Sequence, residues 1–164
     1  MFGGQILPKF PGYILEHLHI GLEDTDPEQA DMEVAPPILN HDFIAELGET
    51  EFSRRSFMKW ERIMHSHGAC LQEVWQLRYT KIPKVCDMVF YPNSTEQVER
   101  LVKLACKHNV VLVPYGGGTN VTKSLQLNQA ETRMIVSVDL GRMNQIKWVD
   151  KENNMACIGA GISG

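Results

Sequence analysis

Val110-Val-Leu-Val-Pro-Tyr-Gly-Gly-Gly-Thr-Asn-Val121 is the stretch that decides the fold of this chain. Its first four residues are apolar and mostly β-branched, which is typical of a buried strand. Pro114 cannot donate a hydrogen bond to a neighbouring strand, so we expect the strand to end there. Gly116, Gly117 and Gly118 permit positive φ angles and a close approach by another group, because they carry no Cβ atom. The stretch therefore predicts a strand and then a loop whose exposed N–H groups face an anion, most often a phosphate.

The spacing of this loop differs from that of two other phosphate-binding motifs. A P-loop requires a glycine directly before its Lys-Ser pair, whereas Thr122 stands there in this chain. A dinucleotide-binding fingerprint requires a third glycine where Val121 stands, although Asp139 lies at the distance expected of a ribose ligand. Both motifs need a helix directly after the loop, and residues 122–133 show no sustained apolar stripe. A glycine turn without a ligand is the alternative, but three successive glycines weaken any structure, which favours a binding use.

Residues 85–113 read as strand, helix and strand. Val85–Tyr91 is strand-like, and Ser94-Thr-Glu-Gln97 is a capping box that starts a helix. Asn109 can adopt the left-handed conformation that ends this helix before the next strand. The helix has one apolar stripe, formed by Val98, Leu101, Val102 and Ala105. We therefore expect two parallel strands, and such sheets bind ligands at the carboxyl ends of their strands, where the glycine loop begins.

The remaining elements are shorter. We expect a helix over Pro11–Ile20, a second helix capped by Asn40 or Asp42, and helical segments within Ser53–Arg78 that His65–Gly68 interrupts. Further strands are expected at Met134–Leu140, Ile146–Val149 and Met155–Ile158, the last two forming a hairpin with Trp148 in the core. The predicted fold class is α+β, with an N-terminal helical arm followed by the βαβ unit and short strands. The predicted domains are an acidic arm and linker at 1–52, a helical connector at 53–84 and an incomplete domain at 85–164.

Charge is unevenly divided along the 164 residues. Between Phe10 and Ser53 there are eleven acidic residues and no Lys or Arg, whereas 15 of the 16 Lys and Arg residues follow Ser53. The basic part suits an anionic ligand, and attraction between the two parts is the alternative use of this charge. No cluster of Lys and Arg is interleaved with aromatic residues, so we expect no nucleic acid partner.

Cysteine and histidine usage gives no metal motif. The four cysteines are widely spaced, which predicts free thiols in an intracellular protein, and no run of apolar residues is long enough to span a membrane. His65, His67 and Cys70 lack a second pair of ligands, so we predict no metal site. A Ser/His nucleophile pair is conceivable there but lacks the elbow motif, so no catalytic residue is assigned. No segment follows the strand and glycine turn that end at Gly164 to pair with them or cover them, which suggests a fragment of a longer protein.

The loop and its surroundings resemble the flavin-binding domain of the vanillyl-alcohol-oxidase and p-cresol-methylhydroxylase superfamily. The resemblance rests on Pro114-Tyr-Gly-Gly-Gly-Thr-Asn-Val121, Tyr91-Pro-Asn-Ser-Thr-Glu-Gln-Val98 and Cys106-Lys-His-Asn109. Within the superfamily the chain is most similar to the alkyldihydroxyacetonephosphate synthase family, through Arg55-Ser-Phe-Met-Lys-Trp60, His67-Gly-Ala-Cys-Leu-Gln-Glu73 and Met143-Asn-Gln-Ile-Lys-Trp-Val-Asp150. Ala160-Gly-Ile-Ser-Gly164 adds to these.

The resemblance implies FAD as cofactor. Its diphosphate-binding segment would be Pro114, Tyr115, Gly116, Gly117, Gly118, Thr119 and Asn120. It further implies an ether-lipid enzyme that exchanges the acyl chain of acyl-dihydroxyacetone phosphate for a long-chain fatty alcohol. The family's catalytic tyrosine and histidine lie in a later domain, so we expect this chain to be inactive alone. A homodimer, peripheral membrane association and a peroxisomal location follow only from the family. The alternatives are a FAD-linked 2-hydroxy-acid dehydrogenase or oxidase, and a non-catalytic chain that binds flavin or pairs with a longer subunit.

Overall fold

The structure is a computed structural model that describes residues 7–21, 23–25, 32–48 and 54–162. The chain forms two compact units, residues 1–31 and residues 32–164. The predicted boundary at residues 52 and 53 and the last two residues of the C-terminal glycine turn lie outside the described ranges.

The first unit contains one helix, α1 (Phe10–Leu18). It ends earlier than the predicted Ile20, because His19 takes a left-handed conformation with φ 55° and its N–H bonds to Leu15 O. Gly21 therefore does not end the helix. No α1 side chain is buried, and Phe10, Tyr13, Leu15 and Leu18 are each more than half exposed.

A four-stranded mixed sheet is the centre of the second unit. Its strands are β1 (Arg54–Ser56), β2 (Met88–Tyr91), β3 (Val111–Tyr115) and β4 (Ile135–Asp139), in the order β1-β2-β4-β3. β4 pairs in parallel with both β2 and β3, while β1 pairs antiparallel with β2. The two strands of the predicted βαβ unit are therefore parallel, with β4 between them. The predicted α+β class is confirmed, although the sequence analysis missed β1.

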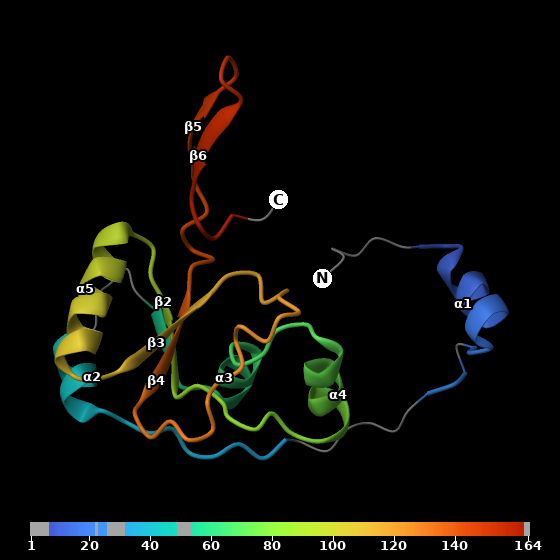
Figure 1. Ribbon diagram of the computed structural model, residues 1–164, viewed down its shortest axis with the longest axis horizontal. Coiled ribbons are helices and arrows are strands. Elements are labelled where there is room, and N and C mark those ends of the chain that lie inside the picture. The colour runs from blue at the N-terminus through green and yellow to red at the C-terminus, as the bar shows by residue number, and fades with distance from the viewer. Residues whose placement is uncertain (1–6, 22, 26–31, 49–53, 163–164) are drawn as a thin grey trace. The chain divides into compact units, whose positions relative to one another are not determined.

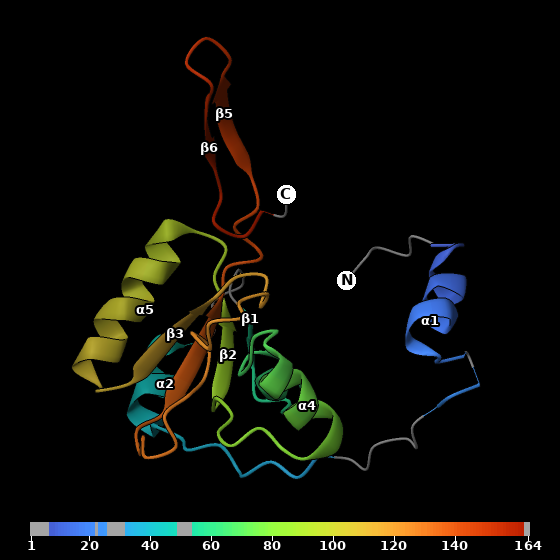
Figure 2. The same cartoon turned by 45° about the vertical axis from the view of Figure 1, so that its right-hand side comes forward.

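Two layers of helices cover the sheet, as Figures 1 and 2 show. α5 (Thr95–Lys107) and α2 (His41–Leu47) lie on one face, while α3 (Lys59–Met64) and α4 (Leu71–Tyr79) lie on the other side. Alternate residues of β2 and β4 point to opposite faces. Met88, Phe90, Val136 and Val138 accordingly join the core under α2 and α5, while Val89 and Ile135 join a smaller core with Leu127.

The main helix forms for the reasons predicted. Ser94 accepts a hydrogen bond from the Gln97 N–H at 3.3 Å, and Gln97 Oε1 reaches back to the N–H of Asn93, one residue before the cap. Asn109 has φ 53°, which releases the chain into β3. Asn40 likewise caps α2 through the N–H of Phe43. These local signals suffice because they satisfy N–H groups that a helix start leaves unpaired.

The prediction that the strand ends at Pro114 is wrong, because β3 continues through Tyr115. β3 is an edge strand, so the missing N–H of a proline can face away from β4 without breaking the ladder. Pro114 is in register with Val138, and Tyr115 with Asp139. The glycine loop therefore begins at the very end of the parallel sheet.

A separate hairpin, β5 (Ile146–Asp150) and β6 (Met155–Ile158), extends away from the sheet (Figures 1 and 2). Its two strands match the predicted ranges. The prediction of Trp148 as a core residue is wrong, because Trp148 is 51% exposed and none of the described helices and other strands packs against the hairpin. Strand periodicity reveals which residues share a face, but it does not reveal whether that face is covered.

Candidate functional site

Three parallel strands end together at one edge of the sheet. Their last residues are Tyr91 of β2, Asp139 of β4 and Tyr115 of β3. The register of the ladders places these residues side by side. The Tyr91 and Asp139 side chains belong to the face opposite α5, because each follows a residue that packs into the core under that helix. Tyr115 shares this face, because Val113, two residues earlier in β3, packs against the smaller core on that side. The site therefore lies at the carboxyl edge of the sheet, where parallel sheets bind ligands.

His65, directly after α3, lies among these three strand ends. Its Nδ1 is 2.7 Å from the backbone oxygen of Glu61, and its Nε2 is 2.7 Å from Asp139 Oδ2. The His65 ring is 4.3 Å from the Tyr115 ring between centroids, and it meets the Tyr91 ring edge-on at 5.7 Å. His65 is buried. It therefore contacts all three parallel strands at once.

Asp139 has both carboxylate oxygens engaged. Oδ2 faces His65, and Oδ1 accepts a 2.7 Å hydrogen bond from the N–H of Gly141. Burial on its own would raise the pKa of Asp139, but these hydrogen bonds outweigh it and hold the pKa below its usual value. Both oxygens therefore take part in contacts within the chain, which gives Asp139 a role in the fold apart from any ribose ligand.

A second buried group of polar side chains borders the same edge. Glu61 is fully buried, and it pairs with Arg54 and accepts a 2.6 Å hydrogen bond from the hydroxyl of Tyr91. The Arg54 guanidinium also lies 4.9 Å from the centre of the Tyr91 ring. Burial, and then the Glu61 carboxylate, raise the pKa of Tyr91 well above its usual value. Tyr91 therefore stays a neutral hydrogen-bond donor at any ordinary pH.

The glycine loop curls over the ring of Tyr115. Gly118 has φ +66°, and a Cβ atom added there would lie 2.9 Å from Tyr115 Cζ and overlap its hydroxyl. Glycine is required at this position for two independent reasons, the backbone conformation and the close approach of the tyrosine.

Gly116 and Gly117 are different, because nothing within the chain requires them to be glycines. A Cβ atom at Gly116 would meet no atom within 4 Å, and at Gly117 it would meet only Thr119 Cγ2, at 3.7 Å. Across the part of the chain that the structure describes, no hydrogen bond engages the N–H groups of Gly116, Gly117 or Gly118. The loop thus combines unpaired donors with open space above two glycines, which fits an anionic group such as a diphosphate.

The end of the loop is anchored to the segment that follows His65. Asn120 O accepts a 2.7 Å hydrogen bond from the N–H of Ala69, and Asn120 Oδ1 accepts one from the N–H of Ser124. A Cβ atom at Gly68 would lie 2.7 Å from the Asn120 amide atoms, so Gly68 permits this close packing. Thr119 is exposed at the loop surface. The predicted segment therefore contains donors in its centre and an anchor at its end.

Comparison with known proteins agrees with this geometry. Residues 86–164 match a family model described as an FAD binding domain. Alkyldihydroxyacetonephosphate synthase from Caenorhabditis elegans is 32% identical over 98% of this chain, and that from Dictyostelium discoideum is 34% identical over 96%. A solved structure of alkyldihydroxyacetonephosphate synthase superposes with a TM-score of 0.81 and 35% identity over 96% of this chain.

The chain is similar to the alkyldihydroxyacetonephosphate synthases. The similarity covers nearly all of this chain but only 27% of the length of the two curated synthases and 30% of the solved one. The predicted resemblance is thereby confirmed, and residues 86–164 match an FAD binding domain.

Most of the residues that lie beside the glycine loop were not predicted from the sequence. From the sequence, His65 was a candidate only for a metal or nucleophile role, and no role was predicted for Tyr91, Glu61 or Arg54. One signal was available, because Tyr91 and Asp139 each fall at the end of an apolar run. Their common neighbour His65 could not be identified, because 74 residues separate it from Asp139.

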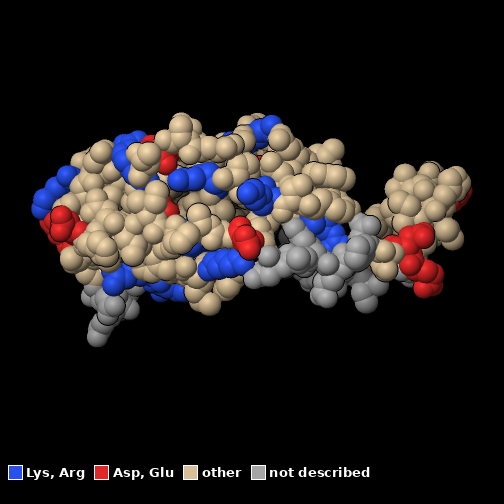
Figure 3. Space-filling model, turned by 90° about the horizontal axis from the view of Figure 1, so that it is seen from below, with Lys and Arg blue, Asp and Glu red and all other residues tan. Residues whose placement is uncertain are grey.

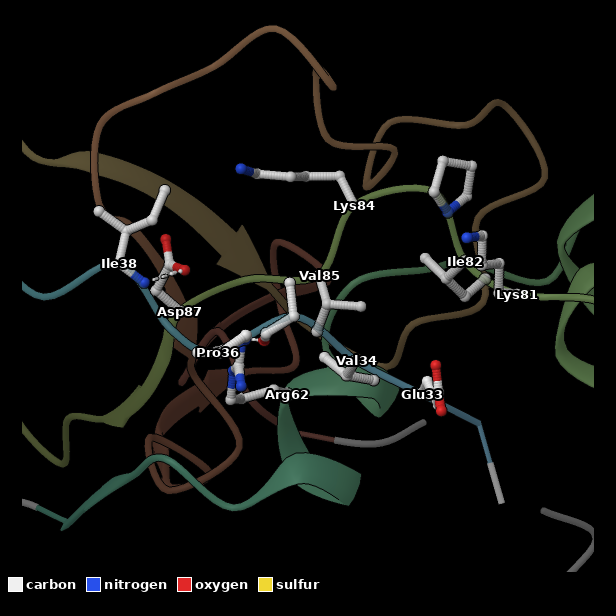
Figure 4. Close-up of a pocket in the computed structure, with 12 residues that line it drawn as sticks. Glu33, Val34, Pro36, Ile38, Arg62, Lys81, Ile82, Lys84, Val85 and Asp87 are labelled. Carbon is white, nitrogen blue, oxygen red and sulfur yellow. Dashed lines mark hydrogen bonds between the residues drawn. The ribbon is translucent and has the colours of Figure 1, made fainter. Parts of the chain in front are cut away.

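Two further features of the second unit lie away from the glycine loop. A cavity of about 210 Å³ is lined by residues 33–36 and Ile38, and by Arg62, Lys81, Ile82, Lys84 and Asp87 among others (Figure 4). Arg62 donates hydrogen bonds to Cys86 O and Ala35 O, so it connects the residue 33–38 segment to the segment before β2.

Figure 3 shows a face on which Lys and Arg outnumber Asp and Glu over much of this unit. In the described ranges no helix is both long and apolar enough to cross a membrane.

Proposed function

We propose that this chain binds FAD, with the amides of Gly116–Gly118 donating hydrogen bonds to the diphosphate. The observation that carries the proposal is that these N–H groups are unpaired in front of open space, at the carboxyl edge of a parallel sheet. The match of residues 86–164 to an FAD binding domain supports the choice of FAD among diphosphate ligands. Pro114 and Tyr115 would place the loop, and Thr119 and Asn120 would close it.

The chemistry assigned to this chain's own residues is binding and positioning. When bound, FAD would supply the reactive isoalloxazine ring. The loop amides would hold the diphosphate without a bound cation, because several aligned N–H dipoles act as a partial positive charge. Tyr91 and Tyr115, whose pKa values are raised by burial, would form a neutral floor beside the loop, which limits the water that competes for the amides.

Replacing Gly117 with valine tests the loop directly. A branched side chain would enter the open space above Gly117, where an added Cβ meets only Thr119 Cγ2 among the described residues, so we expect the fold to survive and FAD to be excluded. We expect at least a tenfold loss of FAD affinity, measured by flavin fluorescence titration and visible absorbance of the purified chain. Thr122→Val, at an exposed position just beyond the loop, is the matched control and should bind as wild type.

Two results of this experiment would overturn the proposal. One is unchanged FAD affinity in Gly117→Val, and the other is a wild-type chain that binds no FAD at all. Thermal unfolding of both variants separates a binding defect from a folding defect, since the proposal requires that their unfolding midpoints match that of the wild type.

We further propose that the protein to which this sequence belongs acts as an alkyldihydroxyacetonephosphate synthase. It would exchange the acyl chain of acyl-dihydroxyacetone phosphate for a fatty alcohol, with homodimer formation, peripheral membrane association and a peroxisomal location as in the family. The support is identity of 32–34% to two such synthases along nearly the whole chain. Incubation with acyl-dihydroxyacetone phosphate and labelled hexadecanol tests this, read as labelled ether product and released fatty acid.

We expect ether formation only from a longer protein, and not from this chain alone. The 164-residue chain alone should form no ether product, because no catalytic group is assigned to it. A protein in which this chain is followed by the remaining length of a synthase should form the product. Oxidation of a 2-hydroxy acid by that longer protein, without ether formation, would favour the alternative of a FAD-linked dehydrogenase or oxidase.

A further inference from the structure

The hydrogen bonds around His65 determine where its protons are. Nδ1 faces the backbone oxygen of Glu61, which can only accept, so Nδ1 carries a proton. Nε2 and Asp139 Oδ2 are 2.7 Å apart, and that contact also requires a proton between them. The pair therefore holds one proton more than a neutral histidine beside a carboxylate would.

The same pair is in contact with the residue that shapes the glycine loop. The His65 ring lies against the Tyr115 ring, and the Tyr115 hydroxyl lies against Gly118 at the left-handed turn of the loop. Because of these contacts, a reorientation of His65 would displace Tyr115, and a displaced Tyr115 would disturb the turn that exposes the loop amides. The segment after His65 also contacts the far end of the loop, through Ala69 N–H and Asn120 O.

We propose that His65 and Asp139 are positioning residues for the diphosphate-binding loop, and that the proton they share keeps the loop in its binding conformation. This inference rests on the proposed FAD binding. It adds a role to two residues that touch no ligand, because they act through Tyr115 and Gly118.

Several titratable groups face the shared proton. Tyr91 and Tyr115 come from β2 and β3, and both have pKa values raised by burial. Glu61 of α3 offers its backbone oxygen to His65, while its side chain pairs with Arg54 of β1. When the shared proton is lost at higher pH, the lone pair of Nε2 faces the Asp139 carboxylate and the contact becomes repulsive. FAD affinity should therefore fall as the pH rises.

Three variants of the full chain test the positioning role. His65→Ala removes the contacts to both Asp139 and Tyr115, and it should weaken FAD binding about tenfold, the effect of losing one charge-assisted hydrogen bond. His65→Gln keeps a neutral donor toward Asp139, so it should bind near wild-type strength at neutral pH and lose the pH dependence. His108→Ala is the matched control, since His108 also pairs with a carboxylate, Glu46, at 2.6 Å, but beside α5.

The outcomes separate this inference from the proposed function. FAD binding by His65→Ala as tight as by His108→Ala, or an unchanged pH profile in His65→Gln, would overturn the positioning role while FAD binding stands. If the wild type binds no FAD, the proposed function fails, and nitrogen NMR of the flavin-free wild type still decides the coupling. It should show both His65 ring nitrogens protonated at neutral pH, and the Gly118 amide shift should change with the same midpoint as the His65 signals. Different pH midpoints for the Gly118 amide and the His65 signals would overturn the coupling. The same NMR comparison tests the coupling if His65→Ala does not fold.

Discussion

At the scale of single residues, three successive glycines have different roles. Gly118 is required by the protein's own backbone and by Tyr115, whereas Gly116 and Gly117 face open space. A run of glycines in a sequence therefore does not by itself identify which position serves the fold and which leaves room for a ligand. Only the positions that the fold leaves free support a binding role.

Replacing Gly118 with alanine should destabilise the chain more than the left-handed conformation alone explains. Gly118→Ala should cost more than the roughly 1–2 kcal/mol of unfolding free energy that a left-handed conformation costs a residue with a Cβ atom, measured in urea. Tyr115→Phe in the Gly118→Ala background should recover part of that loss, because it removes the hydroxyl that the added Cβ would overlap. Tyr115→Phe alone is the control for the loss of the hydroxyl itself. No recovery in the double variant would contradict the contact between Tyr115 and Gly118.

Acid should weaken the chain partly through Asp139. Because its pKa is lowered in the folded state, the carboxylate contributes stability that is fully present above the unfolded value near 3.8. That contribution is lost as the pH falls through the lower, folded value. Asp139→Asn should therefore flatten the pH dependence of the unfolding free energy below about pH 4. Urea titrations between neutral pH and the acid limb measure this, and an Asp139→Asn curve parallel to the wild type would rule out the contribution.

At the scale of elements, α5 depends both on local sequence signals at its two ends and on its packing in the main core. Its cap and its left-handed exit are local, but its stability comes from the face that it presents to β2 and β4. Leu101 is fully buried on that face, while its neighbour Val102 is 45% exposed. The predicted stripe included both residues, and the sheet determines which of them is covered.

Truncation of these two neighbours should separate packing from helix propensity. Leu101→Ala should cost about 2–5 kcal/mol of unfolding free energy, since it leaves a cavity in a closed core. Val102→Ala should change stability little, because a half-exposed valine loses few contacts and alanine favours the helix. Equilibrium unfolding in urea measures both, and a similar loss in the two variants would be inconsistent with the packing of α5.

At the scale of the whole molecule, the second unit is stable in its centre and weak at its hairpin. β4 is paired on both sides and almost entirely buried, whereas β5 and β6 pair only with each other and expose Ile146, Val149 and Met155. An isolated two-stranded sheet is marginally stable in water. The hairpin should therefore open far more often than the sheet does.

Hydrogen exchange should reveal this difference residue by residue. Amides of β4 should exchange only on global unfolding, while those of β5 and β6 should exchange many times faster, through local opening. β2, also in the central sheet, is the internal control. Protection of the hairpin equal to that of β2 in the isolated chain would show that the hairpin is held by contacts beyond its own ladder.

Much of this protein was determined by its sequence alone, because the signals are local. Capping by Ser94 and Asn40, the exit at Asn109 and the alternation of β2 and β4 depend on neighbours a few residues apart. The glycine loop and the resemblance to an FAD binding domain could be read in the same way. The predicted domain boundaries and the diphosphate-binding segment stay predictions.

Only the tertiary structure decided the rest, because it depends on which distant segments meet. It placed β4 between β2 and β3, let Pro114 remain in an edge strand, and left Trp148 uncovered. It also brought His65 to Asp139 and Tyr115, and it showed that the amides of Gly116–Gly118 are unpaired. Distances between residues 50 or more positions apart carry no local signal, so a single sequence cannot reveal them.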